Sequence, residues 1–76
     1  MIKIKLKQLL ADKAFQGDKV TLMELASSTG ISRSTLNRIA NIPSYSTTTD
    51  HLNKICVALN CRLDELAEFV PEKNVE

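Results

Sequence analysis

Polar side chains recur at helical spacing between residues 33 and 41. Arg33, Asn37 and Asn41 form one row at intervals of four residues, and Ser34 and Arg38 form the next row. Residues four apart lie on the same face of a helix, whereas Leu36 and Ile39 fall on the opposite side. In the major groove of DNA a guanidinium can bind guanine O6 and N7 together, and an amide can bind adenine N6 and N7. The spacing suggests a surface that could read base edges, although such a face, taken alone, is most often only solvated.

Five short helices are predicted around this surface. Apolar periodicity, capping residues and Gly or Pro breaks place them at about residues 4–14, 21–30, 32–43, 49–59 and 63–69. The second starts at a capping box formed by Thr21 and Glu24, and Gly30 ends it because glycine tolerates positive φ. No strand pattern competes beyond the first few residues. The sequence therefore predicts an all-α, compact five-helix fold, with one domain at residues 1–70 and a frayed tail at 71–76.

The second and third predicted helices are joined by a very short connection. Two helices that cross steeply around a tight, Gly-containing turn form a helix-turn-helix. Such a crossing needs a small residue where the helices meet, a turn glycine, and apolar residues facing inward from the second helix. Those positions are occupied by Ala26, Gly30, Ile31, Leu36 and Ile39. This agreement makes the polar rows the outer face of a predicted recognition helix.

The 76 residues suffice for one hydrophobic core. Charge is distributed unevenly along the chain. The net charge of +1 is a body of +4 at residues 1–61 cancelled by an acidic end of −3 at residues 62–76. No acid occurs between Glu24 and Asp50, a window that holds two Arg, two Asn and eleven Ser/Thr. The predicted recognition helix lies inside this window. A modest, local positive surface is therefore expected rather than a strongly basic protein.

Several classes of function are disfavoured by the same sequence. The sequence lacks the features that would indicate an enzyme, namely a paired acid and base, a nucleophile near a His, or a phosphate-binding Gly loop. We therefore expect no catalysis, cofactor or small-molecule ligand. Cys56, Cys61 and His51 are too few and too divergent for a zinc site, and Cys56 is interpreted as a small core residue. No apolar run is long enough for a signal peptide or a membrane span. A reduced, cytoplasmic protein without membrane contact is expected.

Residues 21–41 (TLMELASSTGISRSTLNRIAN) resemble the helix-turn-helix of the Cro/CI-type, or XRE, family of phage and bacterial regulators. Residues 52–66 (LNKICVALNCRLDEL) resemble the helix-loop-helix that usually ends that domain, and the similarity covers about residues 4–70. The resemblance implies a lambda-repressor-like five-helix domain that binds double-stranded DNA sequence-specifically. It also implies a homodimer on a palindromic operator and control of transcription.

The sequence departs from the family pattern in three places. Leu22 stands where the family commonly has a Gln that contacts phosphate and braces the recognition helix. Ala40, Asn41 and Ile42 replace the usual Glu-Asn-Gly, so only the Asn is kept. The loop at residues 16–20 is also longer than usual. The phosphate contact of the family's Gln therefore cannot be assigned to this chain.

Candidate site residues follow from both lines of reasoning. The N-terminal residues of a recognition helix reach the bases, which favours Arg33, Ser34 and Asn37 as base-reading residues. Arg38 either reads a base or pairs with an acid of its own chain. Ser32 caps this helix, whose N-terminus suits a phosphate. The resemblance adds phosphate-contacting positions at Thr21, Asn41, Tyr45, Ser46 and Thr48. Packing is an equal alternative for Tyr45, and Lys3, Lys5 and Lys7 fit a solvated face better than a DNA-binding arm.

The leading hypothesis is a small DNA-binding transcriptional regulator, because the sequence combines the turn-spaced helix pair with the acid-free window. At 76 residues no room for an effector domain is expected, which argues against a self-contained ligand sensor. A repressor that blocks a promoter, or an accessory subunit answering to another protein, fits this size. The alternative is a protein-interaction module or antitoxin-like partner that uses the acidic end at residues 63–76. A dimer could form through the C-terminal apolar residues Phe69 and Val70, or through the alternating Ile2 and Ile4 as an exchanged strand.

Overall fold

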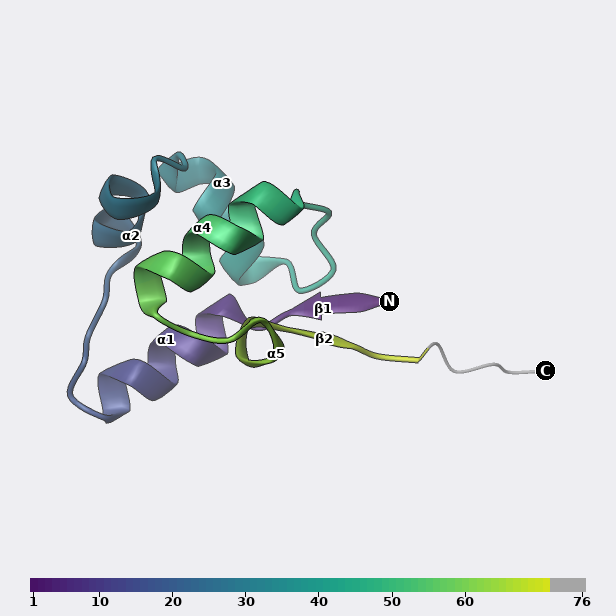
Figure 1. The fold of residues 1–76 in the computed structure, drawn as a ribbon, viewed down its shortest axis with the longest axis horizontal. Helices are drawn as coiled ribbons and strands as arrows, with labels where there is room; N and C mark the ends of the chain where they lie inside the picture. The colour runs from purple at the N-terminus through teal and green to yellow at the C-terminus, as the bar shows by residue number, and fades with distance from the viewer. Residues whose placement is uncertain (72–76) are drawn as a thin grey trace.

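Five helices and two short strands make up residues 1–71, the part of the chain that the computed structural model describes. In chain order they are β1 (Ile2–Ile4), α1 (Leu6–Phe15), α2 (Leu22–Thr29), α3 (Arg33–Asn41), α4 (Thr49–Leu59), α5 (Leu63–Leu66) and β2 (Ala67–Phe69) (Figure 1). The predicted all-α, five-helix fold is thus confirmed, with a small two-stranded sheet added to it. Of the tail expected at residues 71–76, residues 72–76 lie outside the described part.

Local capping chemistry sets the helix boundaries. Thr21 Oγ1 accepts the Glu24 N–H at 3.1 Å, and the Glu24 carboxylate accepts the Thr21 N–H at 2.9 Å, which completes the predicted capping box. The helices α3 and α4 begin after Ser32 and Thr48, whose hydroxyls accept N–H groups from the first turn. Gly30 (φ 76°) ends α2 in the left-handed region. Each such cap is worth about 1 kcal/mol.

The core is a cluster of aliphatic side chains to which every helix contributes. Its fully buried members are Leu6, Leu25, Leu36, Ile39, Ile55 and Leu66. Burying one Leu or Ile side chain stabilises a fold by about 1.5–3 kcal/mol. Because α2 packs against both α3 and α4, this cluster fixes the angle at which α3 is presented to solvent.

The two strands correct the prediction at both ends of the chain. The first helix begins at Leu6 rather than Ile4, and the last ends at Leu66 rather than Phe69. The strands β1 and β2 pair in antiparallel fashion, with Lys3 opposite Glu68. Helical periodicity cannot reveal this pairing, because its hydrogen bonds join segments from opposite ends of the sequence. Apolar residues at alternate positions near residue 68 fit a strand as well as a helix.

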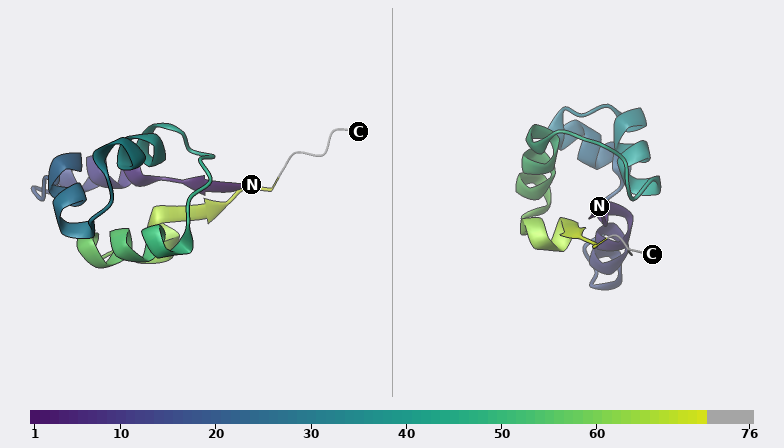
Figure 2. Two further views of the ribbon diagram at one scale, coloured as in Figure 1. Left: turned by 90° about the horizontal axis from the view of Figure 1, so that it is seen from above. Right: turned by 90° about the vertical axis from the view of Figure 1, so that its right-hand side faces the viewer.

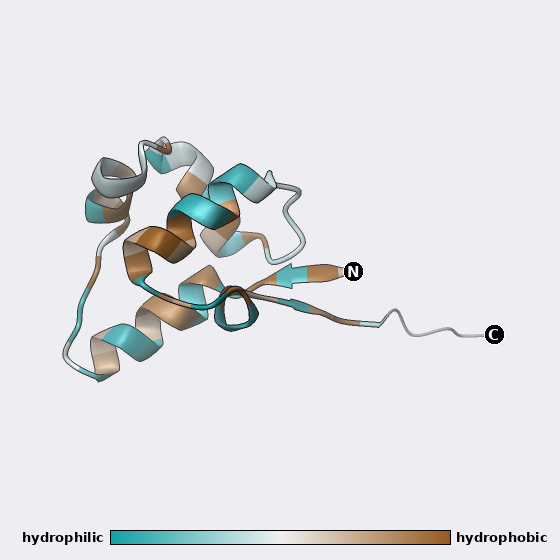
Figure 3. Cartoon of the chain, in the orientation of Figure 1, coloured by the Kyte–Doolittle hydropathy of each residue, from teal (hydrophilic) through white to brown (hydrophobic). Residues whose placement is uncertain are grey.

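The outer end of this ribbon carries exposed apolar side chains. Ile4 and Ala67 face each other and are buried, whereas Ile2 and Phe69, the next pair outward on that face, are 54% and 69% exposed. The strands extend side by side from the helical body in the left view of Figure 2. Figure 3 shows apolar residues toward the outer end of each strand. The ribbon therefore projects an apolar surface away from the core.

None of the helices within residues 1–71 combines the length and apolar character needed to cross a bilayer.

Candidate nucleic-acid interface

The turn between α2 and α3 is held by hydrogen bonds to its own backbone. The Gly30 N–H donates to the Ala26 carbonyl at 2.9 Å. Thr29 is buried; its hydroxyl donates to the Leu25 carbonyl at 2.7 Å and accepts the Ile31 N–H at 3.1 Å. The predicted helix-turn-helix is present, and its turn is closed by a threonine hydroxyl whose role was not predicted from the sequence. A Thr directly before the turn glycine is the signal that was available.

The predicted inner and outer faces of α3 are confirmed. Leu36 and Ile39 are fully buried, and Ile31 in the turn is 5% exposed. The outward side chains of Arg33, Ser34, Asn37, Arg38 and Asn41 are all exposed. Neither arginine pairs with a carboxylate anywhere in residues 1–71, so within that part of the chain Arg38 does not form the internal ion pair considered above. The outer face of α3 presents hydrogen-bond donors to solvent.

Leu22 lies beside the first half of this face. Together with Arg33, Ser34 and Asn37 it lines a shallow hollow, and an adjoining hollow adds Lys7 and Asn41. Leu22 is half-buried and packs against the core. The first turn of α2 thus offers an apolar wall at this place, where the resembled family has an amide.

Lys7 of α1 lies against the C-terminal end of α3. Its ammonium donates to Asn41 Oδ1 at 3.4 Å, and the two residues line a further hollow with Lys3 and Pro43. Lys5, in contrast, forms an ion pair with Glu68 at 3.2 Å. The sequence favours a solvated face for these lysines and carries no signal that Lys7 joins the α3 surface, because α1 and α3 meet only through the tertiary fold.

Asn37 and Asn41 are joined to each other. Asn41 Nδ2 lies 2.9 Å from the backbone oxygen of Asn37 and 2.7 Å from its Oδ1. Both acceptors belong to the preceding helical turn, as the spacing of four residues requires. The second and third positions of the predicted row therefore form one hydrogen-bonded unit.

The positions predicted to contact phosphate lie mostly at helix starts. Thr21, Ser32 and Thr48 are the N-cap residues of α2, α3 and α4, where unpaired N–H groups favour anions. Ser46 is exposed, while Tyr45 is half-buried and packs against the core. Phosphate contact at these positions and at Asn41 stays a prediction.

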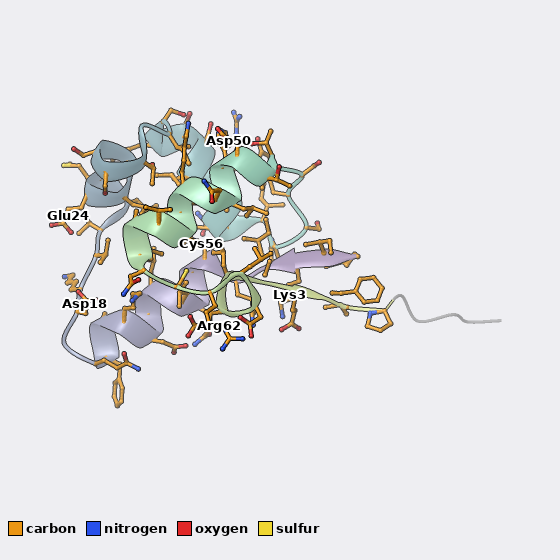
Figure 4. All side chains as sticks on the ribbon, viewed as in Figure 1. Lys3, Asp18, Glu24, Asp50, Cys56 and Arg62 are labelled. Atoms are coloured by element: carbon orange, nitrogen blue, oxygen red, sulfur yellow. The ribbon has the colours of Figure 1, made fainter. Side chains whose placement is uncertain are left out.

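The acidic residues nearest to the helix-turn-helix in the sequence each interact with another group and not with α3. The Glu24 carboxylate caps α2, and Asp50 at the start of α4 pairs with Lys54 at 3.0 Å. Asp18 lies on the connection between α1 and α2 and pairs with Lys13 at 3.8 Å (Figure 4). The donor face of α3 is thus not opposed by an acid in its own helix or turn.

The two cysteines lie apart from this face. Cys56 and Cys61 are free thiols, half-buried and packed against the core, as expected for Cys56. Burial, followed by a hydrogen bond with Cys56, raises the pKa of the Cys61 thiol to about 11. No group of three His, Cys, Asp or Glu side chains within residues 1–71 is arranged to hold a metal ion.

A family model of the Cro/C1-type HTH DNA-binding domain matches residues 5–72. The chain belongs to this family. The Cro/C1-type match spans all five helices, so it confirms the resemblance stated from residues 21–41. No curated protein matches the sequence closely enough to add a relative. As a Cro/C1-type domain the protein binds DNA and acts in transcription regulation, and such domains are typically not enzymes.

Proposed function

We propose that the protein is a transcriptional repressor that binds a palindromic site in double-stranded DNA as a homodimer. One observation carries the proposal: the outer face of α3 exposes Arg33, Ser34, Asn37 and Arg38, and none of these is paired with a carboxylate of residues 1–71. A helix with this face fits the major groove, where base edges offer hydrogen-bond acceptors.

Arg33 is assigned the main base contact. It occupies the first position of α3, and the N-terminal residues of a recognition helix come closest to the base edges. Ser34 and Asn37 lie beside it in the same hollow. Arg38 lies one turn beyond Ser34 and contacts a base or the flanking backbone.

Phosphate binding is assigned to the edges of the same surface. The N-cap residues Thr21 and Ser32 stand at the starts of the two helices of the helix-turn-helix, and Lys7 adds a positive charge at the far end of α3. A protein with a net charge of +1 gains little non-specific affinity. Its affinity must therefore rest on a few well-placed contacts, which a dimer doubles.

The end of the ribbon is assigned the dimer contact. The sequence suggests two alternative dimer contacts, one near Ile2 and one near Phe69, but the two residues lie opposite each other in one sheet. A two-fold dimer uses the same patch on both subunits. The exposed side chains of Met1, Ile2 and Phe69 provide one apolar patch.

Repression is favoured because the described residues form a single helical body built around the helix-turn-helix. Occupying the groove at a promoter excludes other proteins by volume alone, which needs no second domain. An activator would need a further surface for the transcription machinery.

Selection of bound sites from random double-stranded DNA tests the proposal. We expect enrichment of a palindrome whose half-sites lie about one helical turn apart, 10–10.5 base pairs between centres. A reporter placed behind that palindrome should then lose expression when the protein is supplied. Equal affinity for the selected site and for random duplex at every salt concentration would refute sequence-specific binding.

A protein-interaction module is the second candidate. Leu63 is 59% exposed and lies beside the exposed acids Asp64 and Glu65 at the start of α5, so a basic and partly apolar partner would fit this end. A monomer that selects no DNA sequence would favour this function over the repressor.

A further inference from the structure

We propose that a hollow between β1, α1 and the end of α3 binds one phosphate of the DNA backbone, held by Lys3 and Lys7. This site deepens the proposed function and rests on it, because the phosphate belongs to the duplex whose major groove α3 enters. It adds a DNA contact from outside the helix-turn-helix. It also gives different roles to three lysines that stand close together in the sequence.

The hollow lies where the start of the chain meets the end of the recognition helix. The Ile4 N–H donates to the Pro43 carbonyl at 2.8 Å, which fixes β1 beside the residues that follow α3. No Asp or Glu within residues 1–71 lines the hollow. Its polar lining comes from the side chains of Lys3, Lys5, Lys7, Gln8 and Asn41. The hollow is therefore positive, and its charge comes from lysines alone.

Lys5 is bound within the fold. Its ammonium lies 3.2 Å from the Glu68 carboxylate and donates to the Asp64 carbonyl at 3.3 Å. Both partners belong to the α5–β2 side of the molecule. The charge of Lys5 is thus neutralised by its own chain, and the side chain holds β2 against the start of α1.

Lys3 and Lys7 keep their charges available. Both side chains are exposed, and neither pairs with a carboxylate of residues 1–71. Lys3 lies opposite Glu68 in the ribbon (Figure 4), but Lys5 already binds that carboxylate. Lys7 has only a neutral partner, Asn41 Oδ1 at 3.4 Å. Two ammonium groups on one hollow repel each other, so an anion bound between them relieves the repulsion.

A backbone phosphate is the anion that matches this position. Lys7 contacts Asn41, the last residue of α3, so the hollow continues the donor face of α3. A duplex that receives α3 in its major groove carries phosphates along both edges of that groove, and lysines neutralise them. A phosphate contact fixes the position of the protein on the duplex but carries no sequence information.

Lys3→Gln and Lys7→Gln test the site in the full chain bound to a selected palindrome. Each change removes one exposed charge and keeps a long polar side chain. Each should make the dependence of log affinity on log salt less steep, and the double variant should do so by about 0.9 for each subunit. For a dimer this is roughly tenfold less loss of affinity between about 50 and 200 mM salt. Base preference should not change, because a phosphate contact specifies no base.

Arg62→Gln is the matched control. Arg62 is also exposed, but it pairs with Asp64 at 3.2 Å near α5, so the change removes one charge away from the hollow. Circular dichroism checks that all variants are folded. If the two lysine variants change the salt dependence no more than Arg62→Gln does, Lys3 and Lys7 do not contact a phosphate.

Replacing one phosphate at a time by an uncharged methylphosphonate locates the contact. The natural protein and the Arg62→Gln protein should lose affinity when the phosphate beside the end of α3 is replaced. The Lys3→Gln/Lys7→Gln protein should lose nothing further there, because the groups that bind this phosphate are already absent. If every replacement weakens the three proteins equally, the site is wrong.

Failure of this site can be told apart from failure of the proposed function. If the natural protein enriches a palindrome but the lysine variants behave like Arg62→Gln, the function stands and only the site is wrong. If the natural protein binds DNA without enriching any sequence, sequence-specific regulation is wrong, and the methylphosphonate comparison on that duplex still decides whether the lysines bind the backbone. If it binds no DNA, both are wrong.

Discussion

Ile2 lies directly opposite Phe69 at the outer end of the β1–β2 ribbon, although the two residues come from opposite ends of the chain. The apolar patch at this place therefore exists only when both strands are paired. Beyond it the Met1 ammonium donates to the Val70 carbonyl at 2.7 Å, and the Val70 N–H donates to Met1 at 2.8 Å. The patch is therefore present only in molecules in which β1 and β2 are paired.

Phe69→Ser should convert the proposed dimer to a monomer. The ring is 69% exposed in the single chain, so its loss removes apolar contact from the dimer and little from the fold. Light scattering after size exclusion measures the mass, and affinity for a palindrome should fall while affinity for one half-site does not.

Phe15→Ser is the matched control for this change. Phe15 is 93% exposed at the end of α1, outside the ribbon, and the substitution is chemically the same. A mass unchanged by Phe69→Ser, or reduced equally by both variants, would remove the ribbon from the proposed interface.

Arg33→Ala should relax base preference at one position of each half-site. Loss of a bidentate contact to guanine costs roughly 1–3 kcal/mol, and competition binding against single-base variants of the selected site measures it. Arg62→Ala is the control, because it removes the same charge from near α5, well away from α3 (Figure 4). If the Arg33→Ala and Arg62→Ala proteins show the same base preference, Arg33 does not contact a base.

Thr29→Val should destabilise the fold through the turn. Valine keeps the shape of threonine but leaves the Ile31 N–H without its acceptor in a buried place, at a cost of roughly 1–3 kcal/mol. Urea unfolding measures the loss.

Ser28→Ala is the control for the turn. Its hydroxyl makes the same bond to the carbonyl four residues earlier, at 2.7 Å, but is exposed, and a change within about 0.5 kcal/mol is expected. Equal losses in the two variants would show that burial of Thr29 is unimportant.

The Cys61 thiol should make stability fall at high pH. Its pKa is raised to about 11 by burial and by its hydrogen bond with Cys56, against about 8.5 for an unfolded cysteine. A raised pKa means that the unfolded state loses its proton first, so the contribution is complete below about pH 8.5 and is lost as pH rises to about 11.

Urea unfolding between pH 8 and 11 measures this effect as the difference between the natural protein and Cys61→Ala, because that difference removes the pH dependence that the two proteins share. The slope of that difference should be downward with rising pH. A difference independent of pH would contradict the raised pKa.

Local chemistry made much of this fold predictable from sequence. The capping box of Thr21 and Glu24, the caps at Ser32 and Thr48 and the left-handed Gly30 depend on neighbours within a few residues. The exposed row on α3 was predictable for the same reason, since Leu36 and Ile39 orient the helix. The β1–β2 ribbon and the Lys7 contact were not, because each joins segments whose proximity is decided by packing.

The detailed chemistry of the site could be predicted only in part from the sequence. Spacing alone placed Asn37 and Asn41 in one row and suggested contact with adenine for such an amide. The hydrogen bond between the two amides, and the one that Lys7 of another helix donates to Asn41, form only in the folded chain. A sequence pattern names the groups that face the groove but does not say which of them bond to one another.

The pairing of β1 with β2 also orders events during synthesis. The first residues leave the ribosome early, but their strand partner is among the last described segments to emerge. Local helices can form while the chain grows, whereas contacts between distant segments must wait. The patch at Ile2 and Phe69 is therefore incomplete on a growing chain, and nascent copies on one messenger RNA have no finished surface with which to associate prematurely.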